Sequence, residues 1–171
     1  MRAGTPLLPQ QQGGAQESRR RAGTENVPGI VGLATALTLA EAERPAASAR
    51  LAALRDRLEA GLRARIPDLI VNGHPTERLP GTLHVSIPGV EGEALLLLLD
   101  AEGIAASTGS ACTSGSAEPS HVLTAMGLPA DLARASLRLT LGRATTEAEC
   151  ERVLAVLPAA VAQLRALAVT G

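Results

Sequence analysis

The residue best suited to chemistry in this chain of 171 residues is the cysteine at position 112. The stretch from 105 to 121 reads AASTGSACTSGSAEPSH, so Cys112 lies among small and polar residues. A cysteine kept for packing normally lies among large apolar side chains, where its thiol is inert. Repeated glycine and serine predict instead a mobile, exposed loop. The pattern therefore predicts a thiol that can move and react.

The other candidate residues carry weaker signals. Cys150 lies in a helical pattern between Glu149 and Glu151, which favours an incidental thiol. The two cysteines could pair, but two free thiols are the more typical state of a cytosolic chain. The histidines are isolated and show no spacing that would build a metal site; they are His74, His84 and His121.

Composition excludes several classes of protein. A net charge of −1 argues against nucleic acid or an anionic membrane as the main partner. No apolar run approaches the roughly 20 residues that span a bilayer, and the first residues show no signal-peptide core, so a cytoplasmic location is the default. The chain has no Phe, Tyr or Trp, which predicts a core of Leu, Val, Ile and Ala. All 16 basic residues are arginine, and none is lysine.

The elements that must position these residues alternate between helix and strand. Residues 1–25 predict a loop segment, and 26–171 predict one α+β domain of two layers. Helical spacing begins after Asn26, Pro45 should interrupt it, and a second helix should run to residue 66. Strands are expected at 68–72, 82–87, 104–107 and 136–141, and helices at 91–102, 119–126 and from 146 onward. Thr146 and Glu149 have capping-box spacing, and Pro158 should kink or split the last helix.

Two of the expected strands alternate cleanly between apolar and polar residues. In 82–87 the leucine, valine and isoleucine share one face, while His84 lies on the opposite one. In 136–141 three leucines share one face, while Arg138 lies on the other.

Three blocks in family order, the third of them followed by a further short stretch, carry a resemblance to a known family. They read GGAQESRRRAGTENVPGIVG at 13–32, RLPGTLHVSIPGVEGEA at 78–94, STGSACTSGSAEPSHVL at 107–123 and SLRLTLGR at 136–143. The chain resembles, from about residue 6 to 168, the C-terminal part of a pyridoxal-phosphate-dependent cysteine desulfurase of the NifS/IscS-like group, in the class V aminotransferase superfamily. The resemblance implies the small C-terminal domain of a fold type I transferase, with a small, mostly antiparallel sheet packed by helices. Departures from the family pattern include Ala15 for a third glycine and His84 where asparagine is frequent.

The resemblance implies a role for three residues. Cys112 matches the nucleophile that takes sulfur from L-cysteine as a persulfide while alanine is released. Arg138 matches the arginine that pairs with the substrate carboxylate, a task suited to the bidentate geometry of a guanidinium. Thr24 matches the threonine that reaches the cofactor phosphate of the neighbouring subunit in a homodimer. The resemblance leaves open whether Cys112 also serves as a transient metal ligand of an iron–sulfur cluster.

The resemblance also implies parts that this sequence lacks. The family's large N-terminal domain holds the cofactor ring and the lysine that forms a Schiff base with pyridoxal phosphate. A chain without lysine cannot form that bond, so we expect a fragment, one half of a split enzyme or a truncated gene product. The family implies a sulfur-acceptor scaffold of iron–sulfur cluster assembly, or a tRNA-thiolation protein, as partner. Two alternatives stay open: a stand-alone persulfide relay that binds sulfur delivered by another enzyme, and an inactive remnant.

Overall fold

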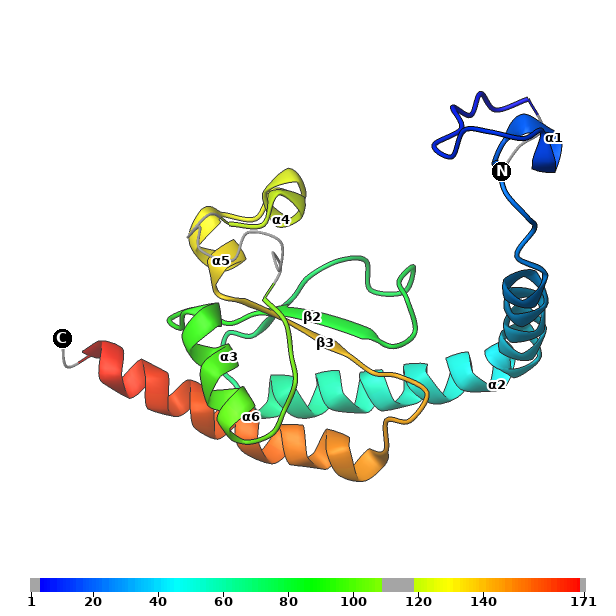
Figure 1. The fold of residues 1–171 in the computed structure, drawn as a ribbon. Coiled ribbons are helices and arrows are strands. Elements are labelled where there is room, and N and C mark those ends of the chain that lie inside the picture. The colour runs from blue at the N-terminus through cyan, green and yellow to red at the C-terminus, as the bar shows by residue number, and fades with distance from the viewer. Residues whose placement is uncertain (1–3, 109–118, 170–171) are drawn as a thin grey trace. The chain divides into compact units, whose positions relative to one another are not determined.

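The computed structural model describes residues 4–108 and 119–169 (Figure 1). Its contacts divide the chain into two compact units, Met1–Pro45 and Ala46–Gly171. The boundary expected at residue 25 stays a prediction.

The first unit contains a short turn and the beginning of a long helix. The turn α1 (Gln16–Arg19) has left-handed backbone angles at Glu17, Ser18 and Arg19, with φ of 49°, 59° and 62°. This turn is the one element in a segment that the sequence predicts as loop. Helix α2 (Val27–Arg65) begins where predicted, because Asn26 Oδ1 accepts a hydrogen bond from the Gly29 N–H at 3.1 Å.

Two prolines lie inside helices that continue past them. The separate second helix expected after Pro45 is not found, since α2 is one helix from Val27 to Arg65 with Pro45 inside it, although the boundary between the two compact units falls directly after this proline. Helix α6 (Glu147–Val169) likewise contains Pro158 without being split. A proline removes one N–H bond of the helical ladder, and the alanine, glutamate and arginine residues around Pro45 are strong helix formers.

The sheet of the second unit has three antiparallel strands in the order β1-β2-β3. They are β1 (Ile70–Val71), β2 (Thr82–Ser86) and β3 (Ser136–Thr140). The register pairs Leu83 with Leu139 and Val85 with Leu137, so the predicted apolar faces meet on one side. The strand expected at 104–107 is reduced to a single bridge between Ser107 and Arg138.

Helices α3 (Gly92–Ala101), α4 (His121–Ala125) and α5 (Ala130–Arg134) connect the strands. Gly103 and Gly127 follow α3 and α4 with φ of 72° and 88°, which confirms the predicted glycine ends. The capping box of α6 is confirmed: Glu149 Oε2 accepts from the Thr146 N–H at 2.7 Å, and the Glu149 N–H donates to Thr146 Oγ1 at 3.3 Å. The sequence did not predict α5, which is too short to show a helical period.

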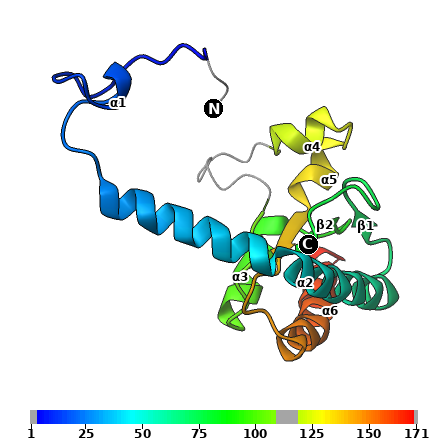
Figure 2. The ribbon, with the colours of Figure 1, turned by 90° about the vertical axis from the view of Figure 1, so that its right-hand side faces the viewer.

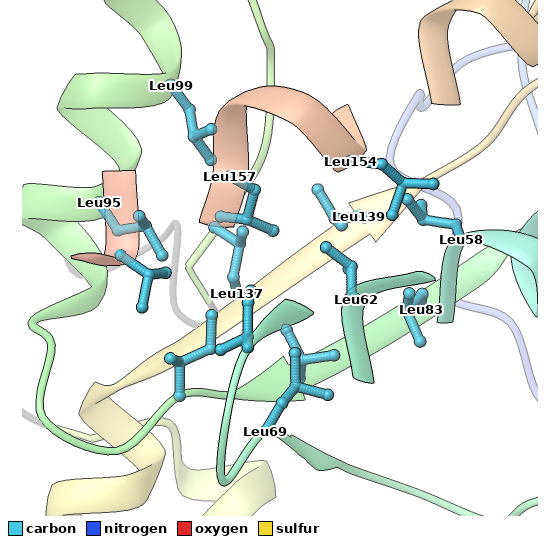
Figure 3. Packing of buried hydrophobic residues seen from close by; sticks show 14 of the residues in the cluster. Leu58, Leu62, Leu69, Leu83, Leu95, Leu99, Leu137, Leu139, Leu154 and Leu157 are labelled. Atoms are coloured by element: carbon cyan, nitrogen blue, oxygen red, sulfur yellow. The ribbon is translucent and has the colours of Figure 1, made fainter. Parts of the chain in front are cut away.

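The core of the second unit lies between the sheet and the helices on one side of it. The part of α2 after residue 45 and α6 lie side by side on this side, while α4 and α5 lie on the other (Figures 1 and 2). Leucines from α2, α3, α6 and both long strands interdigitate there (Figure 3). Leu62, Leu83, Leu95, Leu137 and Leu157 are completely buried. The predicted aliphatic core and the α+β class are confirmed.

None of the helices within residues 4–108 and 119–169 is long and apolar enough to cross a membrane.

Candidate functional site

The face of the sheet that points away from the core carries a polar cluster. Because side chains alternate along a strand, the residues between the buried leucines of β2 and β3 share this second face. Here His84 lies directly opposite Arg138, and Ser86 lies opposite Ser136. Both serines are buried, whereas Arg138 is exposed. We call His84, Arg138, Asn72, Ser86 and Ser107 the polar cluster.

Arg138 presents a guanidinium whose charge is not matched by a described carboxylate. Its backbone is anchored by two hydrogen bonds with Ser107, N–H to O distances of 2.7 and 3.2 Å, and Nη2 donates to Ser107 Oγ at 3.4 Å. Over residues 4–108 and 119–169, no Asp or Glu oxygen lies within ion-pair distance of it. Arg78, by contrast, is held by Glu59 at 2.7 Å. The site can therefore receive an anion from outside the described residues.

His84 is held in a defined orientation by the neighbouring strand. Asn72 Nδ2 lies 3.0 Å from His84 Nδ1 and donates to Ser86 Oγ at 2.8 Å. Asn72 is itself fixed, because its N–H donates to the His84 carbonyl at 2.8 Å. Burial lowers the pKa of His84, and the positive charge of Arg138 lowers it further. The imidazole is thus neutral at pH 7 beside a cation.

The backbone next to Arg138 leads toward the cysteine of interest. Ser107 and Thr108 are the last described residues before 109–118, and Cys112 lies outside the described residues. Gly92, at the start of α3, packs against this point. A Cβ at position 92 would lie 2.6 Å from the Arg134 carbonyl oxygen, 2.8 Å from that of Ser136 and 3.2 Å from Thr108 Cγ2. The absence of a side chain at Gly92 lets α3, β3 and Thr108 meet.

Thr24 belongs to the first unit, in an exposed turn. Gly23 has a φ of 88°, and Arg21 Nη1 donates to the Thr24 carbonyl oxygen at 2.9 Å. Nearby, Arg19 lines a hollow of about 340 Å³ together with Gly13 and Gly14. The turn thus exposes a hydroxyl, and the guanidinium of Arg19 is exposed in the same unit.

The remaining candidates have structural surroundings. Cys150 is a free thiol that packs in the core, and burial, followed by the charge of Glu149, raises its pKa. His74 Nδ1 accepts hydrogen bonds from the N–H groups of Thr76 and Glu77 at 3.2 and 2.8 Å. His121 is exposed at the first residue of α4. In the described part of the chain no three His, Cys, Asp or Glu side chains group as metal ligands do.

Sequence reasoning missed two members of the polar cluster. Asn72 reads as part of an Asn-Gly turn, although its amide joins two residues of β2. Ser107 reads as the end of a strand, although it bonds both the backbone and the side chain of Arg138. The signal that could have found both is the polar face of 82–87 and 136–141, which needs polar neighbours wherever it is buried.

Comparison with known proteins assigns the family. Residues 6–153 match the family described as Aminotransferase class-V. The chain belongs to this family. It is 55% identical over 165 residues to the cysteine desulfurase IscS of Methanosarcina thermophila, covering 96% of this chain and 41% of that protein. It is 50% identical over 165 residues to the cysteine desulfurase NifS of Azotobacter vinelandii, again covering 96% and 41%.

The fold comparison agrees with this class V assignment. A solved structure described as a NifS-like protein superposes with a TM-score of 0.80 at 34% identity, over 95% of this chain and 41% of that one. The chain thus spans about two fifths of the length of the relatives that it matches. The resemblance to the C-terminal part of a NifS/IscS-like enzyme is confirmed.

The class V family implies pyridoxal phosphate, and this chain does not provide a complete site for it. The cofactor's carbonyl bonds to a lysine, and none of the 171 residues is lysine. The turn at Thr24 offers an exposed hydroxyl, and Arg19 is exposed in the same unit, which suits contact with a phosphate but not attachment of the ring. The residues present could therefore contact the phosphate of the cofactor, but they could not bind its ring covalently.

Proposed function

We propose that this chain supplies the sulfur-accepting small domain of a cysteine desulfurase, with Cys112 as the nucleophile and Arg138 as the carboxylate anchor. The Cys112 thiolate attacks the sulfur of L-cysteine, an S–S bond forms, and the C–S bond of the substrate breaks. The electron pair of that bond stays with carbon, which takes up a proton, and alanine leaves. The sulfur then passes from Cys112 to an acceptor for iron–sulfur cluster assembly or tRNA thiolation.

The observation that carries this proposal is the guanidinium of Arg138, which has no carboxylate partner among the described residues. It lies exposed on a rigid strand, without a described carboxylate partner, and its neighbour Ser107 begins the sequence that leads to Cys112. A guanidinium fixed in this way binds a carboxylate with two parallel hydrogen bonds. The carboxylate of an amino acid would then be bound beside Ser107, a few residues before Cys112 in the sequence.

Pyridoxal phosphate, bound by a companion domain with a lysine, supplies the electron withdrawal that weakens the C–S bond. Within this chain Thr24 contributes a phosphate contact, in a homodimer to the cofactor of the neighbouring subunit. The turn around Thr24 supports this role because its hydroxyl is exposed and Arg21 fixes its backbone.

The first turns of α2 expose a group of apolar side chains that a companion domain could cover. Its apolar side chains are more than half exposed at Val27, Ile30, Val31, Leu33, Leu37 and Leu39. Exposed apolar side chains this closely spaced are typical of a surface that another domain or subunit covers. We propose the cofactor-holding domain as that cover.

The test joins this chain to the N-terminal three fifths of the Methanosarcina thermophila relative and measures alanine released from L-cysteine with a thiol reductant. We expect activity in the chimera, no protein persulfide in Cys112→Ser, and a KM for L-cysteine raised at least tenfold in Arg138→Gln. Arg134→Gln is the matched control, since Arg134 is an exposed arginine four residues earlier.

A chimera that folds and binds cofactor but releases no alanine would refute the proposal. So would an Arg138→Gln variant with the KM of Arg134→Gln. The relay alternative has its own result: the chain alone, mixed with an active desulfurase and L-cysteine, would acquire sulfur on Cys112 while the chimera stays inactive.

A further inference from the structure

His84 is the group of the polar cluster that faces Arg138 most directly. The two residues are register partners on adjacent antiparallel strands, so their Cβ atoms lie about 5 Å apart on one face. Burial lowers the pKa of His84, and the positive charge of Arg138 lowers it further. Arg138 is the one charged group that perturbs this pKa among the described residues.

Asn72 determines which nitrogen of His84 carries the proton. Its Nδ2 lies 3.0 Å from Nδ1. Because an amide nitrogen can only donate, Nδ1 of the neutral ring is the acceptor in this contact. A neutral imidazole whose Nδ1 accepts carries its hydrogen on Nε2. Within residues 4–108 and 119–169, Nε2 has no hydrogen-bond partner. The Nε2–H of His84 is therefore available to donate a hydrogen bond on the same face of the sheet as the guanidinium of Arg138.

The support behind this donor is unusually well buried. Asn72 is 8% exposed and Ser86 is completely buried, and the amide of Asn72 bonds both Ser86 and the imidazole. A histidine that merely lies on the surface of a strand needs no buried amide to orient its ring. An imidazole N–H without a described acceptor and a guanidinium without a described carboxylate form a site for an anion with two oxygens.

We propose that His84 Nε2–H and the Arg138 guanidinium bind the same carboxylate, so that His84 is a second anchor for the amino-acid substrate. This assignment rests on the proposed function of Arg138. It adds a neutral donor that orients the carboxylate, while the guanidinium supplies the charge. Asn72 acts as a positioning residue, because it holds the ring without touching the ligand.

The test uses the full chain and two probes, acetate and L-alanine, at constant ionic strength with chloride as the compensating anion. Nuclear magnetic resonance follows the ring carbons of the three histidines and the backbone amides of Ser107 and Arg138. We expect both probes to shift the His84 ring and these amides and to raise the pKa of His84. The ring of His74 is the internal reference.

Three variants separate the contributions. Arg138→Gln should abolish the shifts. His84→Leu, followed through the amides, should weaken binding about tenfold, the lower end of the loss expected for one hydrogen bond to a charged group, because the site is partly exposed. His84→Gln places an amide donor near the position of Nε2 and should bind within about threefold of the wild type. Unchanged amide positions elsewhere in β2 and β3 show that each variant is folded.

The outcomes distinguish this inference from the proposed function. If Arg138→Gln abolishes binding and His84→Leu binds like the wild type, His84 is no anchor, and the role of Arg138 stands. If His84→Gln binds as weakly as His84→Leu, donation from this position is refuted. If neither probe moves any resonance of the cluster, both the anchor and the carboxylate role of Arg138 fail.

Discussion

Substituting Gly92 by alanine tests how tightly the structure assembles the backbone around the proposed site. The added Cβ would lie 2.6 Å from the Arg134 oxygen and 2.8 Å from the Ser136 oxygen, which is 0.8 and 0.6 Å short of ordinary contact at 3.4 Å. Both neighbours are backbone carbonyls at the junction of α5 and β3, so a change of rotamer cannot relieve the contacts. The junction itself must move.

The expected cost follows from these distances. Overpacking of this kind costs about 3 kcal/mol, at the upper end of its usual range, since the colliding atoms are main-chain. The lower entropy of the unfolded alanine chain offsets up to about 1 kcal/mol. The net loss of about 2 kcal/mol should lower the Tm by about 5–10 °C for a unit of this size.

Far-ultraviolet circular dichroism measures this Tm, since a chain without Phe, Tyr or Trp gives no intrinsic fluorescence signal. Gly142→Ala is the matched control: nothing lies within 4 Å of its added Cβ, and its φ lies outside the left-handed region. We expect the Tm of Gly142→Ala to equal or slightly exceed that of the wild type. A Gly92→Ala variant as stable as Gly142→Ala would refute the packing described around Thr108.

Four further predictions concern titration and accessibility. Hydrogen bonds from the Thr146 N–H and then its hydroxyl hold the pKa of Glu149 below its ordinary value, so their stabilising effect is present above the unfolded pKa and is lost as pH falls through the folded one. In urea titrations the free energy of unfolding should therefore fall less from pH 7 to pH 3 in Glu149→Gln, which removes the titrating carboxyl, than in the wild type, and an equal fall would contradict the cap. Because burial and Arg138 lower the pKa of His84, the unfolded ring takes up its proton first, and stability should fall as pH drops below about 6.5. Arg138→Gln should move the His84 midpoint upward in an imidazole titration, and a downward shift would oppose the charge assignment. Cys150, buried and with a raised pKa, should resist iodoacetamide in the folded chain and react in urea, as peptide mass mapping can show; rapid reaction without urea would contradict its burial.

The sequence predicts the sheet well where local pattern and burial agree. The alternation in 82–87 and 136–141 predicts which side chains face the core, because one face of each strand must be buried. Glycine and capping signals likewise predict the ends of α3 and α4 and the beginning of α6. These features depend on neighbours within a few residues.

The prolines and the short elements show where local signals are insufficient. Proline disfavours a helix interior by removing one bond, but Pro45 and Pro158 lie in long runs of helix formers whose remaining bonds outweigh that loss. Strand pairing at 104–107 depends on how many of its residues form hydrogen bonds with β3. Among the described residues the structure shows one bridge there, between Ser107 and Arg138. Neither outcome can be read from the residues concerned.

The site depends most on contacts between distant residues. Arg138 could be singled out from its block, but its bond to Ser107 joins positions 31 apart. His84 reads as a departure from the family pattern, and only the register of β2 against β3 places it opposite Arg138. Asn72, directly after β1, orients the ring of His84. A carboxylate site built in this way from two strands and the segments beside them has its charge in one residue and its orientation in the others. A change at Asn72 or His84 should therefore alter how the substrate is held without removing the charge that attracts it.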